Sequence, residues 1–211
     1  MKNTSTTIMT PGKSEYGSYF PSAFTLETPR VLMRLLAPED LKQLSALGKD
    51  KSIWTWWVQE LNEEAAMKRW IDDMLLERTQ EKRMPFTVID KDGYTICGST
   101  SFLNISFYDK RVEIGSSWLG TDFIGTGVNR QAKFALLCYA FEVMKMERVE
   151  VKTDNLNERA KAALLKVGMI PEGVLRSHMQ MHSNRRRDSL YFSILKDEWP
   201  ERKESFFVDL L

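Results

Sequence analysis

The sequence is poor in cysteine and has no long hydrophobic run. Its 211 residues include only two cysteines, Cys97 and Cys138, and both stand in apolar segments, TICGS and ALLCYAF. That setting is typical of buried reduced thiols, and two cysteines are too few for a disulfide framework. No apolar segment approaches the roughly 20 residues that span a bilayer. We therefore expect a soluble, cytoplasmic chain with no membrane partner.

A net charge of one sign is also lacking. The chain carries 30 Lys+Arg and 29 Asp+Glu, a formal net charge of +1. Surfaces that bind nucleic acid or an acidic membrane carry clustered positive charge, so the balance argues against direct DNA binding. The charge is uneven along the chain, however, because residues 124–196 hold 13 Lys+Arg against 7 Asp+Glu. A local basic patch therefore stays open.

Residues that could hold a metal are scarce as well. The two histidines, His178 and His182, are four residues apart on an expected strand and therefore on one face. No third Cys, Asp or Glu stands at ligand spacing, so we expect no metal site. Neither cysteine has a suitably spaced histidine in the sequence, which argues against an acyl-cysteine intermediate.

We interpret the chain as a flexible N-terminal arm over residues 1–25 and a single domain over residues 26–211. The arm is rich in Ser, Thr, Pro and Gly and lacks the basic start and apolar stretch of a signal peptide. No linker or repeat divides the remainder. Its elements alternate as strand, two helices, three antiparallel strands, helix, strand, helix and two strands. This order predicts an α+β domain with a mixed sheet flanked by helices.

The expected elements follow from periodicity and from turn residues. Strands are expected over residues 30–36, 84–90, 95–105, 111–119, 148–153, 172–181 and 188–195. Helices are expected over residues 41–47, 62–81, 129–145 and 158–167, with a short one at the C-terminus. The pair Asp92-Gly93 predicts a hairpin turn with positive φ.

The most informative segment is Thr121–Ala132, with the sequence TDFIGTGVNRQA. Gly125 and Gly127 stand one residue apart between an expected strand and an expected helix. Glycine lets the backbone approach a ligand closely, while the N–H groups and positive end of the helix face outward. The pattern is typical of a phosphate-binding loop and also of a plain tight turn. A Walker loop and a Rossmann loop are excluded, because the Gly-Lys-Ser/Thr and the third glycine are absent.

Four further motifs surround this loop in a fixed order. EIG…WLG precedes it, and KTDNLNERAKAALLKVGM, PEGVLRSHM and RDSLYFSIL follow. In this order the chain resembles the GNAT family of acetyl-CoA-dependent N-acetyltransferases, and within it the Rim-type branch of ribosomal-protein N-terminal acetyltransferases. The resemblance runs from about Arg30 to Trp199. It implies a mixed, mostly antiparallel sheet with a splayed central strand pair, and acetyl-CoA as cosubstrate without a metal.

The resemblance also implies a set of cofactor-binding positions. Trp118 and Leu119 match the bulged strand to which the pantetheine arm adds, through its backbone in the case of Trp118. Asn157 matches an asparagine that contacts this arm, and it equally fits a plain helix N-cap. The residues that match the pyrophosphate loop are Ile124, Gly125, Thr126, Gly127, Val128 and Asn129. Ile124 and Asn129 depart from the polar and small residues of the family pattern.

Two residues are candidates for proton transfer. The resemblance places Glu113, eleven residues before the loop, as the general base that takes a proton from the amine, and a solvated glutamate is the alternative. An amine with a pKa of about 8 to 10 must lose a proton before it attacks. His178 is a second acid or base candidate near the amine, because imidazole titrates near neutral pH. A main-chain N–H near Leu119 would stabilise the oxyanion.

The general acid of the family has no counterpart. Members of the family commonly carry Tyr or Ser where this chain has Leu164 and Ala160, and neither of these can donate a proton. A thiol has a pKa of about 8.5, so its thiolate can leave near neutral pH without a strong acid. A water, Ser116 or Ser177 could also donate the proton.

Aromatic residues mark the expected acceptor side. Trp54, Trp56 and Trp57 precede the second helix, expected over residues 62–81, which forms a wall of the acceptor cleft in the family. Core packing and a substrate pocket are both open for them. The acidic remainder of the chain would suit a cationic amine, while the basic residues 124–196 would hold a cofactor with three phosphates. The run Arg185–Arg187 fits a solvated turn, or an acidic protein or RNA surface.

These features together predict a transferase that moves an acetyl group from acetyl-CoA to a primary amine by direct transfer in a ternary complex. The acceptor is either a protein N-terminus or a small molecule. Two alternatives remain, a CoA-binding module that has lost catalysis and an RNA- or ribosome-binding protein. A homodimer is compatible with the sequence.

Overall fold

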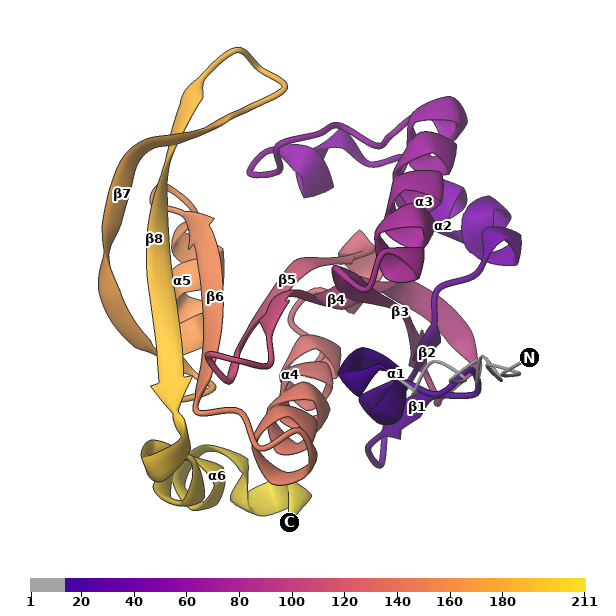
Figure 1. Ribbon diagram of the computed structural model, residues 1–211. Coiled ribbons are helices and arrows are strands. Elements are labelled where there is room, and N and C mark those ends of the chain that lie inside the picture. Colours follow the sequence, from indigo (N-terminus) through magenta and orange to yellow (C-terminus); the bar gives the residue numbers. More distant parts are fainter. Residues whose placement is uncertain (1–13) are drawn as a thin grey trace, which may run out of the picture.

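The computed structural model describes residues 14–211, which form an eight-stranded sheet with helices on both faces (Figure 1). The strands are β1 (Thr25–Glu27), β2 (Val31–Leu35), β3 (Arg83–Asp90), β4 (Thr95–Ser106), β5 (Arg111–Leu119), β6 (Arg148–Asp154), β7 (Ile170–Gln180) and β8 (Arg186–Leu195). The helices are α1 (Glu15–Tyr19), α2 (Leu41–Leu47), α3 (Glu64–Thr79), α4 (Val128–Cys138), α5 (Glu158–Leu165) and α6 (Trp199–Phe207). The spatial order of the strands is β1-β2-β3-β4-β5-β6-β8-β7. The predicted α+β fold with a mixed, mostly antiparallel sheet is confirmed.

The sheet opens between β5 and β6. These two strands pair in parallel, and their register runs only from Arg111 opposite Arg148 to Glu113 opposite Glu150. β5 continues to Leu119, and the two strands diverge beyond the paired part (Figure 1). Their facing backbone groups are therefore free to pair with an added strand-like segment. The splayed central pair is confirmed.

A β-bulge lies in β5 beside this opening. Ser99 of β4 pairs with Trp118 and Ser101 pairs with Gly115, so two residues of β5 oppose one residue of β4. One of the two, Ser116, has a φ of 49°, which is uncommon for a residue with a side chain. A bulge interrupts the alternation of a strand and re-aims the side chains that follow it. It thereby sets the direction of β5 where β5 and β6 part.

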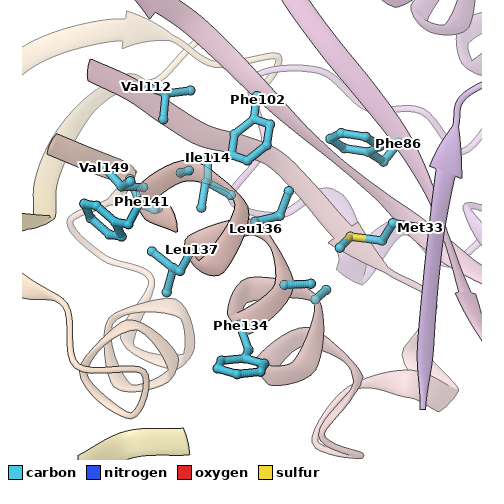
Figure 2. Packing of buried hydrophobic residues seen from close by; sticks show 14 of the residues in the cluster. Met33, Phe86, Phe102, Val112, Ile114, Phe134, Leu136, Leu137, Phe141 and Val149 are labelled. Atoms are coloured by element: carbon cyan, nitrogen blue, oxygen red, sulfur yellow. The ribbon is translucent and has the colours of Figure 1, made fainter. Parts of the chain in front are cut away.

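Each face of the sheet has its own hydrophobic core. On one face, α4 buries side chains that meet every second residue of β5, as Val112 and Ile114 illustrate. Figure 2 shows these two residues with Phe86, Phe102 and Leu136 around α4. On the other face, α2 and α3 cover a second cluster that includes three tryptophans, Trp54, Trp70 and Trp118. The opening between β5 and β6 is thus held by two independent cores.

The second half of the predicted flexible arm is folded. Tyr16, Phe20 and Phe24 are each at least nine-tenths buried, and Phe24 packs edge-on against Tyr139 with ring centroids 4.8 Å apart. Burying aromatic rings of this size stabilises the segment by several kcal/mol, on the order of 2 kcal/mol each. The prediction for residues 14–25 was therefore wrong, and the rest of the arm, residues 1–13, lies outside the described residues.

Two local details differ from the sequence-based expectation. In the hairpin between β3 and β4 the positive φ falls on Tyr94, at 49°, and not on the predicted Asp92-Gly93 pair. The helix expected over residues 129–145 is α-helical to Cys138 and continues as a π-helical turn, Tyr139–Val143. The other predicted elements match the observed ones to within a few residues at their ends.

Candidate active site

A cleft of about 650 Å³ occupies the opening between β5 and β6. Residues from helices on both faces of the sheet line it, α4 and α5 on one face and α3 on the other. The strands contribute the part of β5 that includes Glu113 and the bulge, the end of β6, and single residues of β7 and β8. The cleft therefore joins the two faces of the sheet, so that one ligand could enter from each side.

The glycine loop leads into α4 on the first side. Gly125 and Gly127 have φ values of 81° and 94°, a left-handed conformation that favours glycine. A Cβ atom added at either position would meet nothing within 4 Å, so the backbone here is open to a ligand. No side chain caps the start of α4, whose N-cap residue is Gly127. Uncapped N–H groups at a helix start form an anion-binding geometry.

The predicted loop residues take different positions. Asn129 lines the cleft, while the Val128 side chain is fully buried in the core around α4. Ile124 is partly buried, and Thr126 is exposed, with its hydroxyl donating to the Phe123 carbonyl at 2.8 Å. Any contact of Val128 with a ligand would therefore involve its backbone.

At the bulge, the side chain and the backbone of Trp118 have separate roles. The indole is 5% exposed and packs against Trp54, with ring centroids 5.0 Å apart. The backbone pairs with β4 on one side, as does that of Leu119. The β5–β6 register ends at Glu113, so within the described sheet the other side of both residues is unpaired. The Trp118 side chain is therefore a core aromatic, and its main chain is available at the opening.

Asn157 begins α5 at the edge of the cleft. Its Oδ1 accepts the Ala160 N–H at 3.0 Å, which makes it a helix N-cap, and the residue also lines the cleft. Ala160 and Leu164 follow on the same helix and line the cleft as well. The positions that lack a proton donor therefore do face the site.

Glu113 lies in the cleft as one half of an ion pair. The residue is 2% exposed, and Lys152 Nζ lies 2.6 Å from both of its carboxylate oxygens. Asn104 Nδ2 donates to the same carboxylate at 2.8 Å. The solvated glutamate that sequence analysis left open is excluded by this burial.

His178 does not line the cleft. It stands on β7 with its ring centroid 5.9 Å from that of Tyr191, and its Nδ1 is buried without a hydrogen-bond partner among the described residues. Burial, together with the positive charges of Lys152 and Arg187, lowers the pKa of His178. The imidazole is therefore neutral near pH 7, one residue away from Met179, which does line the cleft.

The three candidate acceptor tryptophans separate into two groups. Trp54 is fully buried, and its Nε1 donates to the Gly48 carbonyl at 2.8 Å, so the proposal that it contacts substrate was wrong. Trp56 and Trp57 line the cleft. Trp57 packs edge-on against Trp54 at 5.3 Å, which ties the acceptor wall to the core beneath it.

Lys133 was not among the predicted site residues, yet it lies on α4 and lines the cleft. The residue is 5% exposed and has no carboxylate within 4 Å among the described residues. Its Nζ donates to Ser117 Oγ of the bulge at 3.3 Å. Burial lowers the pKa of Lys133 to about 8. Lys133 stands four residues after Asn129 and among apolar residues of the predicted helix. A lysine in that position is the sequence feature that could have indicated it.

The run Arg185–Arg187 does not form a patch. Arg185 forms an ion pair with Asp154 and lies over the Trp56 ring at 5.9 Å. Arg186 donates to Ser177 from the exposed side of β8. Arg187 is 8% exposed and lines the cleft. Adjacent arginines on a strand thus point in different directions.

Metal-ligating side chains and the two cysteines were the other candidates for chemistry in the sequence. Among residues 14–211, no group of three or more His, Cys, Asp or Glu could hold a metal ion. Burial raises the pKa of both Cys97 and Cys138 to about 12, so neither supplies a thiolate at neutral pH. No described helix is both long and apolar enough to cross a membrane.

The chain is similar to several known proteins. Residues 30–170 match the family model described as "Acetyltransferase (GNAT) domain". The "Putative ribosomal N-acetyltransferase YdaF" of Bacillus subtilis is 32% identical over 112 residues, which cover 53% of this chain and 60% of that protein. The spermidine N(1)-acetyltransferase of Escherichia coli is 25% identical over 145 residues, 69% of this chain and 75% of that one.

Solved structures show the same architecture. A GCN5-related N-acetyltransferase from Brucella melitensis superposes with a TM-score of 0.81 at 26% identity, over 90% of this chain and 87% of that one. A structure described as a "putative acetyltransferase" from T. thermophilus gives the same TM-score at 29% identity, over 91% of this chain and 98% of that one. The fold is therefore shared with these proteins.

Proposed function

The chain belongs to the GNAT family of acetyl-CoA-dependent N-acetyltransferases, and we propose that it acetylates a primary amine by direct transfer within a ternary complex. The observation that carries this proposal is the continuous cleft through the open sheet. It joins the uncapped start of α4 on one face to Trp56 and Trp57 on the other. A cosubstrate and an acceptor bound from opposite sides would meet at the bulge of β5.

The residues on the α4 side fit acetyl-CoA. The open backbone at Gly125 and Gly127 and the helix start would hold the pyrophosphate. The unpaired main chain at Trp118 and Leu119 would pair with the pantetheine arm, and Asn157 stands where its side-chain NH₂ group could donate to that arm. When bound, acetyl-CoA supplies the activated acetyl group as a thioester.

Glu113 is the proposed general base. Its carboxylate faces the cleft close to the point where the two sides meet, and the ion pair with Lys152 holds it in place. An attacking amine must lose a proton, and a positioned carboxylate can accept it directly or through one water. His178 is a neutral imidazole next to Met179 of the cleft lining, and we propose it as a secondary proton acceptor.

The lack of a proton donor at Ala160 and Leu164 favours a second candidate, a CoA-binding module without catalysis. Both side chains face the cleft and neither can protonate a leaving thiolate. Direct transfer is still chemically feasible, because a thiol with a pKa of about 8.5 leaves as the thiolate near neutral pH. Among the described residues no contact favours an RNA- or ribosome-binding role, since the three arginines that suggested it point in different directions.

The proposal is tested by release of free thiol from acetyl-CoA with a panel of peptide N-termini, polyamines and aminoglycosides. We expect thiol release with at least one class of amine and a matching mass increase of the acceptor. The panel covers both acceptor types named for the relatives, ribosomal proteins and spermidine. Tight binding of acetyl-CoA without turnover across the panel would instead support the noncatalytic module.

The cofactor loop gives a separate prediction. Gly127→Ala should lower the free energy of unfolding by about 1 kcal/mol, because its φ of 94° is strained for alanine. It should also weaken acetyl-CoA binding by about tenfold, or about 1.4 kcal/mol, since the added methyl group enters the open side of the loop. Calorimetric titration with acetyl-CoA measures the effect.

Gly173→Ala is the matched control. A Cβ at Gly173 also meets nothing within 4 Å, but the residue lies on β7, away from the loop. Its acetyl-CoA affinity should equal that of the wild type. Equal affinity in both variants would remove the loop from the cofactor site.

A further inference from the structure

Arg187 is a buried cation without a partner. Its side chain lines the cleft at 8% exposure. Among residues 14–211, no carboxylate lies within 4 Å of it. Its Nε is buried and has no hydrogen-bond acceptor among the same residues. Burying a charge without a partner is strongly unfavourable, so such groups in proteins are normally paired. An unpaired guanidinium facing a cleft therefore points to a ligand that supplies the negative charge.

The nearby carboxylates are already engaged. Asp154 forms an ion pair with Arg185, and Glu113 forms one with Lys152 at 2.6 Å. The cluster thus contains three cations and two carboxylates, and Arg187 is the cation left over. Burial lowers the pKa of Arg187, while Asp154 and Glu113 act in the opposite direction. These five groups together carry a net charge of +1, which one anionic group would neutralise; Lys133, which lines the same cleft from α4, is not counted among them.

Arg187 lies on the acceptor side of the cleft. β6 ends at Asp154, which pairs with Ser189, so Arg187 stands beyond the end of β6 on the hairpin formed by β7 and β8. This hairpin faces the segment before α3 (Figure 1). His182 Nε2 lies 3.2 Å from the Trp54 carbonyl, and Arg185 lies over the Trp56 ring. The proposed pyrophosphate loop leads into α4, which packs in the other hydrophobic core, away from the core that contains Trp54.

We propose that Arg187 binds a carboxylate of the acceptor, so that the preferred substrate is an amine that also carries an acidic group. A free amino acid and a peptide with an acidic residue at its N-terminus both have this chemistry. A guanidinium suits the role because its planar fork of N–H groups matches the two oxygens of a carboxylate. This inference rests on the proposed function, since it assigns the acceptor half of that site.

Matched amine pairs test the proposal through kcat/KM. One pair is an Asp-initiated and an Asn-initiated peptide of otherwise equal sequence, and the other is an amino acid and its amide. We expect the wild type to prefer one acid over its neutral partner by about ten- to hundredfold, a range typical of a hydrogen bond to a charged group. The pair that shows the preference identifies whether the side-chain or the α-carboxylate is bound.

In Arg187→Gln the acid-to-neutral ratio should fall about ten- to hundredfold relative to the wild type, with the loss in the KM of the acid. Because both enzymes are compared on the same pair, differences in amine pKa cancel. Arg187→Lys should keep part of the preference. Arg69→Gln removes an exposed arginine of α3 that lies outside the cleft lining, so its ratio should equal that of the wild type.

Melting temperatures separate recognition from a structural role. Without ligands, Arg187→Gln should melt at the same temperature as the wild type or higher, because it removes an unpaired buried charge. A lower melting temperature together with an unchanged acid-to-neutral ratio would show a structural role and overturn the proposal. Weaker acetyl-CoA binding with an unchanged ratio would assign Arg187 to the phosphates of the cofactor and would also overturn it.

The proposed acetyl transfer and the proposed role of Arg187 are contradicted by different results. If no amine releases thiol, the proposed acetyl transfer is contradicted, and the role of Arg187 is then measured by thermal shift alone. The acidic member of a pair should raise the melting temperature of the wild type more than its neutral partner does, and this difference should vanish in Arg187→Gln. If amines are acetylated without any preference for the acid, the acetyltransferase stands and the assignment of Arg187 is wrong.

Discussion

Glu113→Gln should lower kcat by about a hundred- to ten-thousandfold at pH 7, the range expected when a general base is removed. Glutamine keeps the size of the side chain and cannot accept the proton of the amine. The loss should shrink as the pH rises toward the pKa of the amine, about 8 to 10, because the amine is then neutral without a base. The pH profile of kcat with a single amine measures this. A loss that is independent of pH would argue against a base.

The same substitution also breaks a buried ion pair, and a second variant separates the two effects. Removing one partner of such a pair is strongly destabilising, by about 3 to 5 kcal/mol, because the other charge stays buried. Lys152 would be that charge, with its side chain 15% exposed. In the double variant Glu113→Gln/Lys152→Met the stability should return toward that of the wild type while kcat stays low. Recovery of kcat together with stability would show that Glu113 only holds the fold.

Much of the fold could be predicted from local patterns. Strands with a period of two and helices with apolar residues three and four apart were placed correctly, because each pattern reports one buried face. The helix α1 was missed because five residues carry too little periodicity to register. Burial of Tyr16, Phe20 and Phe24 depends on contacts with residues far away in the sequence, such as Tyr139, and no local pattern contains that information.

The site was predictable only where a side chain acts close to its own motif. The glycine loop and Asn157 lie at element boundaries, where sequence signals are strongest. Trp54 and Trp56 are two residues apart in one aromatic run, and tertiary packing alone decides that the first is buried and the second faces the cleft.

The net charge of a segment does not determine which of its charges face the acceptor side. The acidic part of the chain was expected to face a cationic amine, yet Arg187 comes from the basic part, residues 124–196. It reaches the acceptor side because β8 returns beside β6 and extends past its end. The charge within a cleft depends on which strands lie beside it. The spatial order of the strands cannot be obtained from a sum of charges over the sequence.

Lys133→Met should raise the free energy of unfolding by up to about 3 kcal/mol at pH 7. The size of this gain follows from the pKa of Lys133, which burial lowers from 10.5 to about 8, at about 1.4 kcal/mol per pKa unit. Below pH 8 the ammonium is charged in both states, so the folded state bears the full cost of burying it. Loss of the bond to Ser117 Oγ, at 3.3 Å, offsets part of the gain.

The gain in stability from Lys133→Met should depend on pH, because Lys133 titrates at a lower pH in the folded chain than in the unfolded one. Between about pH 8 and 10.5 the unfolded chain binds more protons than the folded one at this site, so the stability of the wild type rises with pH. The methionine variant has no such titration, and its advantage should therefore shrink across the same range. Denaturant unfolding of both proteins from about pH 7 to 10 measures the difference, in which the titrations of all other groups cancel. A constant difference would mean that folding leaves the charge of Lys133 unchanged, and that its ammonium is hydrated within the cleft in spite of its burial.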